Sequence, residues 1–481
     1  MNYTTIEFYI FIIVVCFIYY LVGLLFNGRF QWCVLLAGSV YFYYQVVKDV
    51  SSLFLLAFSV IVSYVSGLVC QKELKRPFRR VIFWISIGLV VFPLLLIKFN
   101  GTLISVKTNI IAPIGISFYT LQLIAYICDC YHKNIIAQTN LLKHVLSTIF
   151  FPHIIQGPIP KYGILREQLF SSHSYDSDLF MHGVQKIIYG FFLKLMIADK
   201  AAVFVNNVFD GKIEFVGGYI IIAAIFYSFQ LYTDFYSCTL LSQGVALMFG
   251  IRLSENFKHP YFSLSIKEFW RRWHISLSTW LRDYIYIPLG GGKKGKFRKY
   301  LNICITFLIS GLWHGNSMQF LVWGGMHALY QIVEECAKEA ENKIYLKIGI
   351  GQTSVAYRII KTVTTFSLVT LAWIIFRAKS LTAGIIMIKK MFSYYNPWAL
   401  FGMELFDVGL DRFDFVVLQN SIFVLIVISY LQEKGISLHV WLQKQHLIIR
   451  WCIYIIGIVS IWIFGTYGYG FNAQDFIYGG F

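Results

Sequence analysis

The chain has 481 residues, of which 58% are hydrophobic and 14% are charged, and its formal net charge at pH 7 is +17. Soluble domains contain roughly 25% charged residues, so this composition excludes an ordinary soluble protein and indicates one that crosses a membrane several times. A strongly basic protein could bind nucleic acid, but here the positive charge gathers in short loops between apolar segments. We therefore expect no nucleic-acid partner.

Apolar segments of about 20 residues, the length that crosses a bilayer as a helix, recur along the whole chain. They predict an all-α fold, a polytopic bundle of about eleven or twelve transmembrane helices, with residues 1–481 in a single membrane-embedded domain. The expected spans lie near 8–26, 30–47, 51–70, 81–98, 110–128, 183–206, 217–233, 300–312, 317–334, 357–376, 418–431 and 449–466.

Two clusters of lysine and arginine, within 72–80 and 293–299, set the expected orientation of these spans. Because positively charged loops stay on the cytoplasmic side of a membrane, both clusters are expected inside the cell. Counting the spans back from the first cluster places the N-terminus outside.

Two long polar intervals interrupt the spans, at 134–182 and 252–299. The first contains FFPHIIQGPIPKYG, whose three prolines cannot continue a helix, so we expect a bent or re-entrant loop there. The second is dense in Trp, Arg and Tyr, which predicts amphipathic or re-entrant helices at the cytoplasmic surface. Residues 336–356 and 393–415 are expected to be surface loops.

Two acids stand within or beside apolar segments, Asp199 in KLMIADKA and Asp234 in YSFQLYTDFYS. A carboxylate at that depth is costly without a partner, so each is expected to pair with a basic or hydroxyl group inside the bundle. Either carboxylate could instead orient a histidine.

The segment EFWRRWHISLSTWLRDYIYIPLGGG is unlike the rest of the chain and carries the first candidate catalytic histidine, His274. An interfacial anchor would explain its arginines about equally well, but the density of unusual residues favours a functional site. Arg282 and Asp283 could pair with each other within the helix. The candidate substrate- or donor-binding residues are Arg271, Arg272, Trp273, Arg282, Asp283, Asp234 and Trp313.

His314 is the second candidate catalytic histidine, because it ends the apolar run YLNICITFLISGLWHG just before another, MQFLVWGGMHALY. A titratable imidazole between two membrane-length segments is expensive and usually belongs to a site. Gly311 and Gly315 would let another backbone or a substrate approach its ring. A neutral imidazole is the usual general base for taking a hydroxyl proton. The alternative is a core histidine hydrogen-bonded to a neighbouring helix.

Other site chemistries have less support. No Asp, Glu or Cys lies three or four residues from His274 or His314, so no metal site is expected. No GxSxG motif supports a hydrolase. His327 follows His314 at a distance of about 20 Å along one straight helix, and we interpret it as structural.

Several motifs together resemble one family. The strongest is ENFKHPYFSLSIKEFWRRWHISLSTWLRDYIYIPLGG, followed by LISGLWHG and VWGGMHAL, with APIGISFYTLQLIAYICDCY, FFPHIIQGPIPKY and GFFLKLMIADK upstream. Over about residues 110–335 the chain resembles the membrane-bound O-acyltransferase (MBOAT) family, in particular its bacterial branch similar to alginate O-acetyltransferases. After Asp234 the chain lacks the glycine and the second acid of the family's usual DFSGYSD pattern, which puts the acceptor or partner contact in doubt.

This resemblance implies a ring-like bundle of tilted helices in which funnels reach a central histidine from both faces. His314 would match the catalytic histidine and His274 the second, cytoplasmic-side histidine. The implied reaction passes an acetyl group from a cytoplasmic thioester, acetyl-CoA or another acyl thioester, to an extracellular polysaccharide. The implied location is a bacterial cytoplasmic membrane, with an extracellular SGNH-type protein as partner and no bound cofactor.

Two alternatives stay open at this point. D-alanyl transfer to teichoic acid with a carrier protein is the work of another branch of the family, although TWLRDYIYIPLGG resembles the acetylating branch more. A transporter or channel would also bury polar residues, but it should show broken helices in two related halves, and no internal repeat is found in the sequence.

Overall fold

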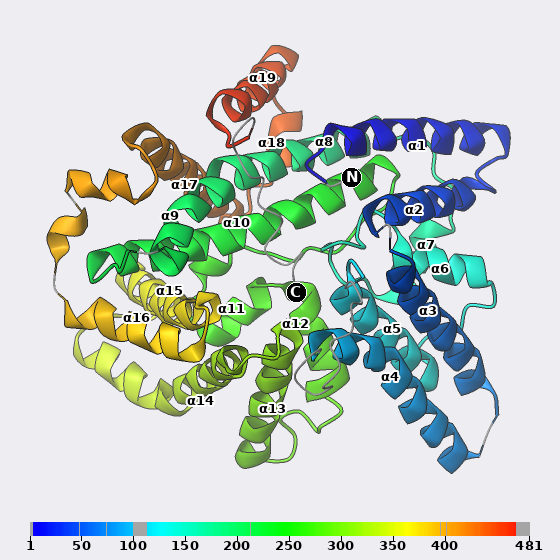
Figure 1. Cartoon of the computed structure of the whole chain (residues 1–481), viewed down its shortest axis with the longest axis horizontal. Helices are drawn as coiled ribbons and strands as arrows, with labels where there is room; N and C mark the ends of the chain where they lie inside the picture. Colours follow the sequence, from blue (N-terminus) through cyan, green and yellow to red (C-terminus); the bar gives the residue numbers. More distant parts are fainter. Residues whose placement is uncertain are drawn as a thin grey trace. The chain divides into compact units, whose positions relative to one another are not determined.

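The computed structural model describes residues 3–47, 49–73, 75–99, 113–211, 213–394, 396–400 and 402–467. In these residues the chain consists of helices joined by loops and contains no strand, and Figure 1 shows the helices coloured along the sequence. The elements are α1 (Ile6–Leu25), α2 (Gln31–Val47), α3 (Val50–Gln71), α4 (Arg76–Lys98), α5 (Ile116–Tyr131), α6 (Leu141–Ile149), α7 (Tyr162–Leu169), α8 (Ser177–Phe191), the π-helix η1 (Phe192–Ala198), α9 (Asp199–Asp210), α10 (Gly218–Met248), η2 (Pro260–Phe262), α11 (Ile266–Arg272), α12 (Ile275–Leu281), the π-helix η3 (Arg282–Tyr286), α13 (Lys296–His314), α14 (Met318–Lys347), α15 (Val355–Arg377), α16 (Leu381–Ser393), η4 (Pro397–Leu400), η5 (Met403–Val408), α17 (Arg412–Glu433), α18 (Leu438–Gln443) and α19 (Leu447–Phe464).

The all-helical, multi-pass fold predicted from the sequence is confirmed. Six of the described helices are long and apolar enough to cross a membrane, namely α1, α3, α4, α15, α17 and α19. The other predicted spans fall on helices that do not meet both conditions, such as α2 with 17 residues. The total of about eleven or twelve spans therefore stays a prediction. The predicted span 110–128 begins outside the described residues.

Two regions differ from the sequence predictions. The prediction of a surface loop at 336–356 was wrong for most of that range, because α14 continues to Lys347. That stretch, CAKEAENKIYLK, is rich in Ala, Glu and Lys, which favour helix even without an apolar stripe. An unpredicted helix, α16, follows Ser380, whose hydroxyl accepts a hydrogen bond from the Ala383 N–H and so caps its first turn.

The described residues form two compact units. The first contains those within Met1–Gly190 and Cys238–Glu255, and the second those within Phe191–Ser237 and Asn256–Ile477. Both candidate catalytic histidines belong to the second unit. The sequence prediction of one domain over 1–481 stays a prediction.

A bent loop lies between α6 and α7 in the first unit, as the three prolines predict. It is buried along most of its length, and two hydrogen bonds tie it to neighbouring helices. The Phe151 N–H donates to Ser39 Oγ at 3.2 Å, and the His153 ring shares a hydrogen bond with Gln122 Oε1, also at 3.2 Å. Because a buried loop must find partners for its polar groups, these contacts fix its path.

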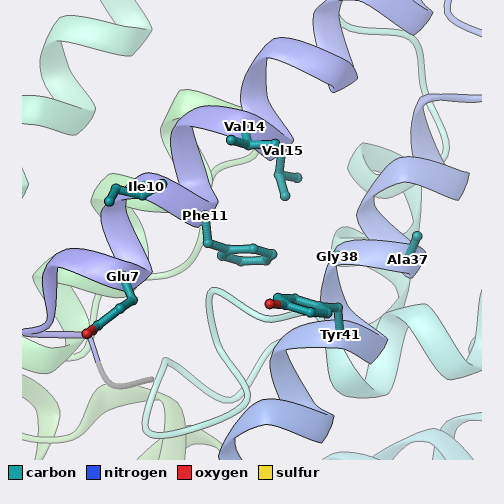
Figure 2. A pocket seen from close by; sticks show the side chains of 8 residues that line it. All are labelled: Glu7, Ile10, Phe11, Val14, Val15, Ala37, Gly38 and Tyr41. Atoms are coloured by element: carbon teal, nitrogen blue, oxygen red, sulfur yellow. The ribbon is translucent and has the colours of Figure 1, made fainter.

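An open groove of about 530 Å³ lies between α1 and α2 in the same unit, and Figure 2 shows its lining. The rings of Phe11 and Tyr41 stack across it with centroids 5.8 Å apart. Its lining is mostly apolar and includes neither candidate histidine. The groove is therefore not the candidate site. It is lined by Glu7, Ile10, Phe11, Val14, Val15, Ala37, Gly38 and Tyr41.

The pair α13–α14 is the framework of the second unit's candidate site. The chain reverses between His314 and Met318, so the two helices pack against each other (Figure 1). Two glycines make the contact close. A Cβ at Gly311 would lie 2.3 Å from the Phe320 carbonyl oxygen, and one at Gly324 would lie 2.4 Å from the Phe307 carbonyl oxygen. Small residues at such positions let helix backbones approach in a membrane protein.

We expect Gly324→Ala to destabilise the protein by about 1–3 kcal/mol, because the added methyl overpacks the contact with α13. The control is Gly325→Ala, since a Cβ there would meet nothing within 4 Å. That change should be neutral or slightly stabilising, as alanine favours helix over glycine. Unfolding of the purified protein in detergent measures both. Equal stability of the two variants would contradict the close contact.

Candidate active site

His314 is the last residue of α13, where the helix stops against a tight turn. Gly315 caps the helix, and its N–H donates to the Gly311 carbonyl at 3.2 Å. A Cβ at Gly315 would lie 2.4 Å from the Phe320 ring, so only glycine fits this turn without displacing that ring. The turn leaves the His314 side chain 3% exposed.

The His314 imidazole is enclosed by aromatic rings from three helices. Its ring centroid lies 4.8 Å from that of Trp313, 5.1 Å from that of Trp323 on α14 and 5.2 Å from that of Phe376 on α15. All three rings meet it edge to face. Such contacts hold an imidazole in place by packing and exclude water around it. The prediction of a buried histidine at the end of an apolar helix is confirmed.

His274 lies at a break between α11 and α12, where its backbone is left-handed with φ 43° and ψ 56°. Non-glycine residues are uncommon in this region, and histidine is among those that tolerate it. The break is held from both sides by a neighbouring segment. The Lys258 N–H donates to the Arg272 carbonyl, and the Ile275 N–H donates to the Asn256 carbonyl, each at 2.9 Å. These bonds satisfy the backbone where the helix is interrupted.

His274 and His314 both contact one indole. The Trp313 ring centroid is 6.1 Å from that of His274 and 4.8 Å from that of His314. His274 also contacts Phe235 at 4.7 Å, edge to face. His274 lies outside the six candidate spans and is 1% exposed. Its burial lowers the pKa of the imidazole and favours the neutral form.

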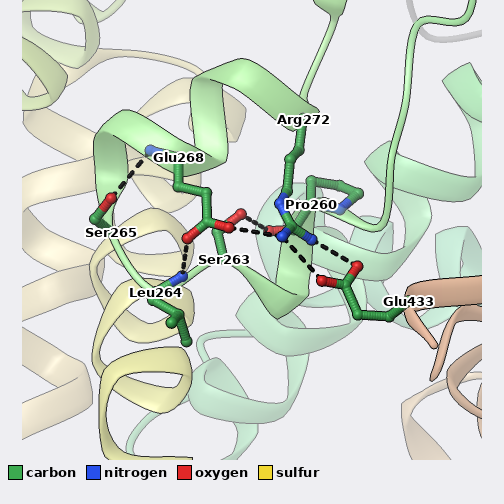
Figure 3. Close-up of polar contacts among 7 residues, drawn as sticks. All are labelled: Pro260, Ser263, Leu264, Ser265, Glu268, Arg272 and Glu433. Atoms are coloured by element: carbon green, nitrogen blue, oxygen red, sulfur yellow. Dashed lines mark hydrogen bonds and ion pairs between the residues drawn. The ribbon is translucent and has the colours of Figure 1, made fainter. Parts of the chain in front are cut away.

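Arg272 is engaged by two carboxylates (Figure 3). Its guanidinium donates to Glu268 Oε1 at 2.6 Å and to both oxygens of Glu433 at 2.8 and 2.9 Å. Glu268 in turn accepts the Leu264 N–H at 2.8 Å, while Ser265 caps α11. The fork-shaped guanidinium therefore links α11 to the end of α17. Donor binding by Arg272 stays a prediction.

The other predicted binding residues occupy different surroundings. Arg271 is exposed on α11. Trp273 is buried, with ring centroids 5.2 Å from Trp373 and 5.4 Å from Phe269. Of the predicted set, Trp313 is the one that the described ring contacts place against both histidines. Three predicted ion pairs are confirmed: Arg282 with Asp283 at 2.8 Å, and Asp234 and Asp199 each with a basic group, Lys194, at 2.8 and 2.9 Å.

Trp323 and His327 lie beside His314, which the sequence analysis did not predict. Both imidazoles, His314 and His327, lie 5.1 Å from the Trp323 ring centroid. The estimate of about 20 Å between the two histidines assumed one straight helix, and that assumption was wrong because the chain reverses after His314. The glycines at 311 and 324 are the sequence signal for this close hairpin.

The described part of the second unit thus holds three buried histidines joined through tryptophans. His327 is fully buried, and its Nδ1 accepts a hydrogen bond from Trp270 Nε1 at 3.2 Å, which places the His327 proton on Nε2. A neutral imidazole in a water-poor enclosure can take a proton from a hydroxyl group and return it later. The arrangement suits acyl transfer to a hydroxyl.

The family model of the membrane-bound O-acyltransferases matches residues 138–347, which include all three histidines. Among curated proteins, the chain is similar to "Probable alginate O-acetylase AlgI" of Pseudomonas fluorescens. The two are 36% identical over 386 residues, which cover 80% of this chain and 73% of that protein.

Two further relatives carry different names. The peptidoglycan O-acetyltransferase of Helicobacter pylori is 30% identical over 449 residues, covering 84% of this chain and 80% of that protein. The teichoic acid D-alanyltransferase of Bacillus subtilis is 30% identical over 238 residues, covering 46% of this chain and 58% of that protein.

We expect Trp270→Phe to lower the free energy of unfolding by about 1–3 kcal/mol, because it removes the donor to His327 Nδ1 and leaves a buried acceptor. The control is Trp462→Phe on α19, whose side chain is 73% exposed and should matter by less than about 0.5 kcal/mol. Detergent unfolding curves measure both. A loss that is no larger for Trp270→Phe would show that this bond is not formed.

Proposed function

The chain belongs to the membrane-bound O-acyltransferase family, and from this premise we propose that it passes an acetyl group from a cytoplasmic thioester to a hydroxyl of an extracellular polysaccharide. The observation that carries the proposal is the pair of buried imidazoles, His274 and His314, which both contact Trp313. The two relatives covered over most of their length are named for O-acetylation of alginate and of peptidoglycan.

His314 acts as the general base in this proposal. Its neutral imidazole takes the proton of the acceptor hydroxyl, and the hydroxyl oxygen attacks the carbonyl carbon of the thioester. The carbon–sulfur bond then breaks, and the leaving thiolate recovers the proton from the imidazolium. The rings of Trp313, Trp323 and Phe376 keep the imidazole in position, which aligns base and substrates for the transfer.

His274 orients the donor from the cytoplasmic side. Its neutral imidazole can share a hydrogen bond with the thioester end of acetyl-CoA. Exposed lysines between the π-helix η3 and the start of α13, namely Lys293 and Lys294 in the loop and Lys296 at the first position of α13, offer positive charge for the donor's phosphates. The orientation with the N-terminus outside and both basic loops inside belongs to this proposal, as does the location in a bacterial cytoplasmic membrane.

The acceptor side involves a second protein in this proposal. An extracellular SGNH-type protein receives the acetyl group or places it on the polymer. The chain lacks two residues of the family pattern after Asp234, so its contact with acceptor or partner differs from the pattern there. The relatives' names share O-acetylation but not the polymer, and the proposal is accordingly for a polysaccharide hydroxyl without a named sugar.

We expect His314→Ala to reduce polysaccharide-bound acetate by about 10²–10⁴-fold, the usual contribution of a general base. The measurement is base-released acetate from purified surface polysaccharide, in cells that lack the chromosomal copy. His132→Ala, at the exposed end of α5, is the control and should acetylate normally. Wild-type acetylation by a membrane-inserted His314→Ala protein would refute the catalytic role.

The same cells, fed labelled acetate or labelled D-alanine, separate the two branches of the family. Label from acetate in the polysaccharide supports the proposal. Label from D-alanine in teichoic acid that depends on His314 would instead favour D-alanyl transfer, the activity for which the Bacillus subtilis relative is named.

We expect His274→Ala to raise the KM for acetyl-CoA by about tenfold or more while kcat falls less than in His314→Ala, because a donor-orienting group contributes to binding as well as to the chemical step. Steady-state transfer in membrane vesicles with varied acetyl-CoA measures this. An unchanged KM with a kcat as low as that of His314→Ala would assign His274 to the chemical step instead.

A further inference from the structure

Three charged side chains meet in the interior of the second unit. Lys194 of the π-helix η1 forms ion pairs with Asp199 Oδ1 at 2.9 Å and with Asp234 Oδ1 at 2.8 Å. The three side chains are 4%, 4% and 2% exposed, respectively. One cation thus joins η1, the start of α9 and the middle of α10 without contact with bulk water.

The π-helix makes the first of these pairs possible. The Asp199 N–H donates to the Lys194 carbonyl, five residues back, as the π-helical pattern requires. This bond stacks the two residues one turn apart. In an α-helix, residues five apart point about 140° away from each other, and the side chains would separate. The uncommon backbone of η1 is therefore coupled to the ion pair.

Burial of these charges is expensive, so stability alone does not account for them. Taking ions out of water costs several kcal/mol each, and apolar residues of similar volume often stabilise a fold as well or better. In some proteins a buried polar or ionic group instead fixes the register between the elements that carry it. Here Lys194 on η1 fixes the rotation and position of α10 by holding Asp234.

Phe235, the residue after Asp234, connects the rotation of α10 to the candidate site. Phe235 follows Asp234 on α10 and is fully buried. Its ring meets the His274 imidazole edge to face, with centroids 4.7 Å apart, and also contacts Phe257 at 5.1 Å. A rotation of α10 that moved Asp234 would therefore move the ring that lies against His274.

We propose that Asp234, held by Lys194, is a positioning residue for His274. The ion pair fixes the rotation of α10, and α10 presents Phe235 to the imidazole. Asp199 neutralises the same lysine from α9, which is not the helix that carries Phe235. This role deepens the proposed function, because it makes the orientation of the donor-side histidine depend on a buried charge remote from the reacting atoms.

The matched variants are Asp234→Asn and Asp199→Asn. Each leaves Lys194 with one carboxylate partner, and the two carboxylates are buried to nearly the same extent. A purely structural triad predicts similar effects for both. Positioning predicts that Asp234→Asn alone disturbs His274. The probe is diethyl pyrocarbonate, which modifies accessible neutral imidazoles, and mass spectrometry of peptides reports the modification of His274 alone.

We expect Asp234→Asn to raise the modification rate of His274 by about fivefold or more, as the Phe235 ring loosens, and Asp199→Asn to change it by less than about twofold. Donor-dependent transfer should fall about tenfold or more in Asp234→Asn, because small misplacements of catalytic groups are costly. A further control is Lys200→Met, which removes another buried lysine, paired with Asp414 on α17 rather than with Asp234.

Phe235→Leu keeps the triad intact and should reproduce the exposure of His274, so it decides the question if Asp234→Asn does not accumulate in the membrane. Equal His274 modification in the two Asn variants, or an unchanged rate in both Asp234→Asn and Phe235→Leu, would overturn the proposal. The labelling needs no activity. If His314→Ala still acetylates polysaccharide, the proposed function fails while this comparison still decides the positioning role.

Discussion

The distance of closest approach between α13 and α14 is the constraint on which the candidate site depends. Helices normally stand apart by the thickness of their side chains, but Gly311 and Gly324 remove that thickness at two points of contact. The backbones can then meet, and Trp323 comes against His314 at 5.1 Å. With a wider separation, the imidazole would lose one of its enclosing rings and gain a cavity or water in its place.

A second constraint is the need to satisfy backbone groups where a helix is interrupted. The break at His274 would leave unpaired N–H and carbonyl groups in a water-poor interior, which is costly. The segment around Asn256 and Lys258 supplies these partners, so the left-handed residue is over-determined by its surroundings. Strained residues held in this way are frequent at functional sites. The two histidines are therefore positioned in different ways: His314 by close helix packing and His274 by backbone hydrogen bonds.

The sequence predicts the features that depend on local pattern. Hydropathy was sufficient for the helical multi-pass fold, and the cost of a buried imidazole was sufficient to select His314. The sequence did not predict which side chains from distant segments contact one another. Asp234 was expected to pair with a basic or hydroxyl group, but the partner, Lys194, lies forty residues earlier. The position of the Lys194 side chain depends on a π-helix, which the hydrophobic periodicity of the sequence does not predict. The closeness of His327 to His314 was not predicted, because the reversal after Gly315 is set by packing rather than by propensity.

The density of indoles around the histidines gives the candidate site an optical signature. Trp270 and Trp373 both lie 5.7 Å from Trp323, and Trp273 lies 5.2 Å from Trp373. Indoles this close, in a fixed mutual orientation, couple their electronic transitions. The near-ultraviolet circular dichroism of the intact protein is then more sensitive to the order of this cluster than to the order of the other tryptophans. The protein thus carries an intrinsic spectroscopic reporter at the site itself, readable without substrate, label or partner.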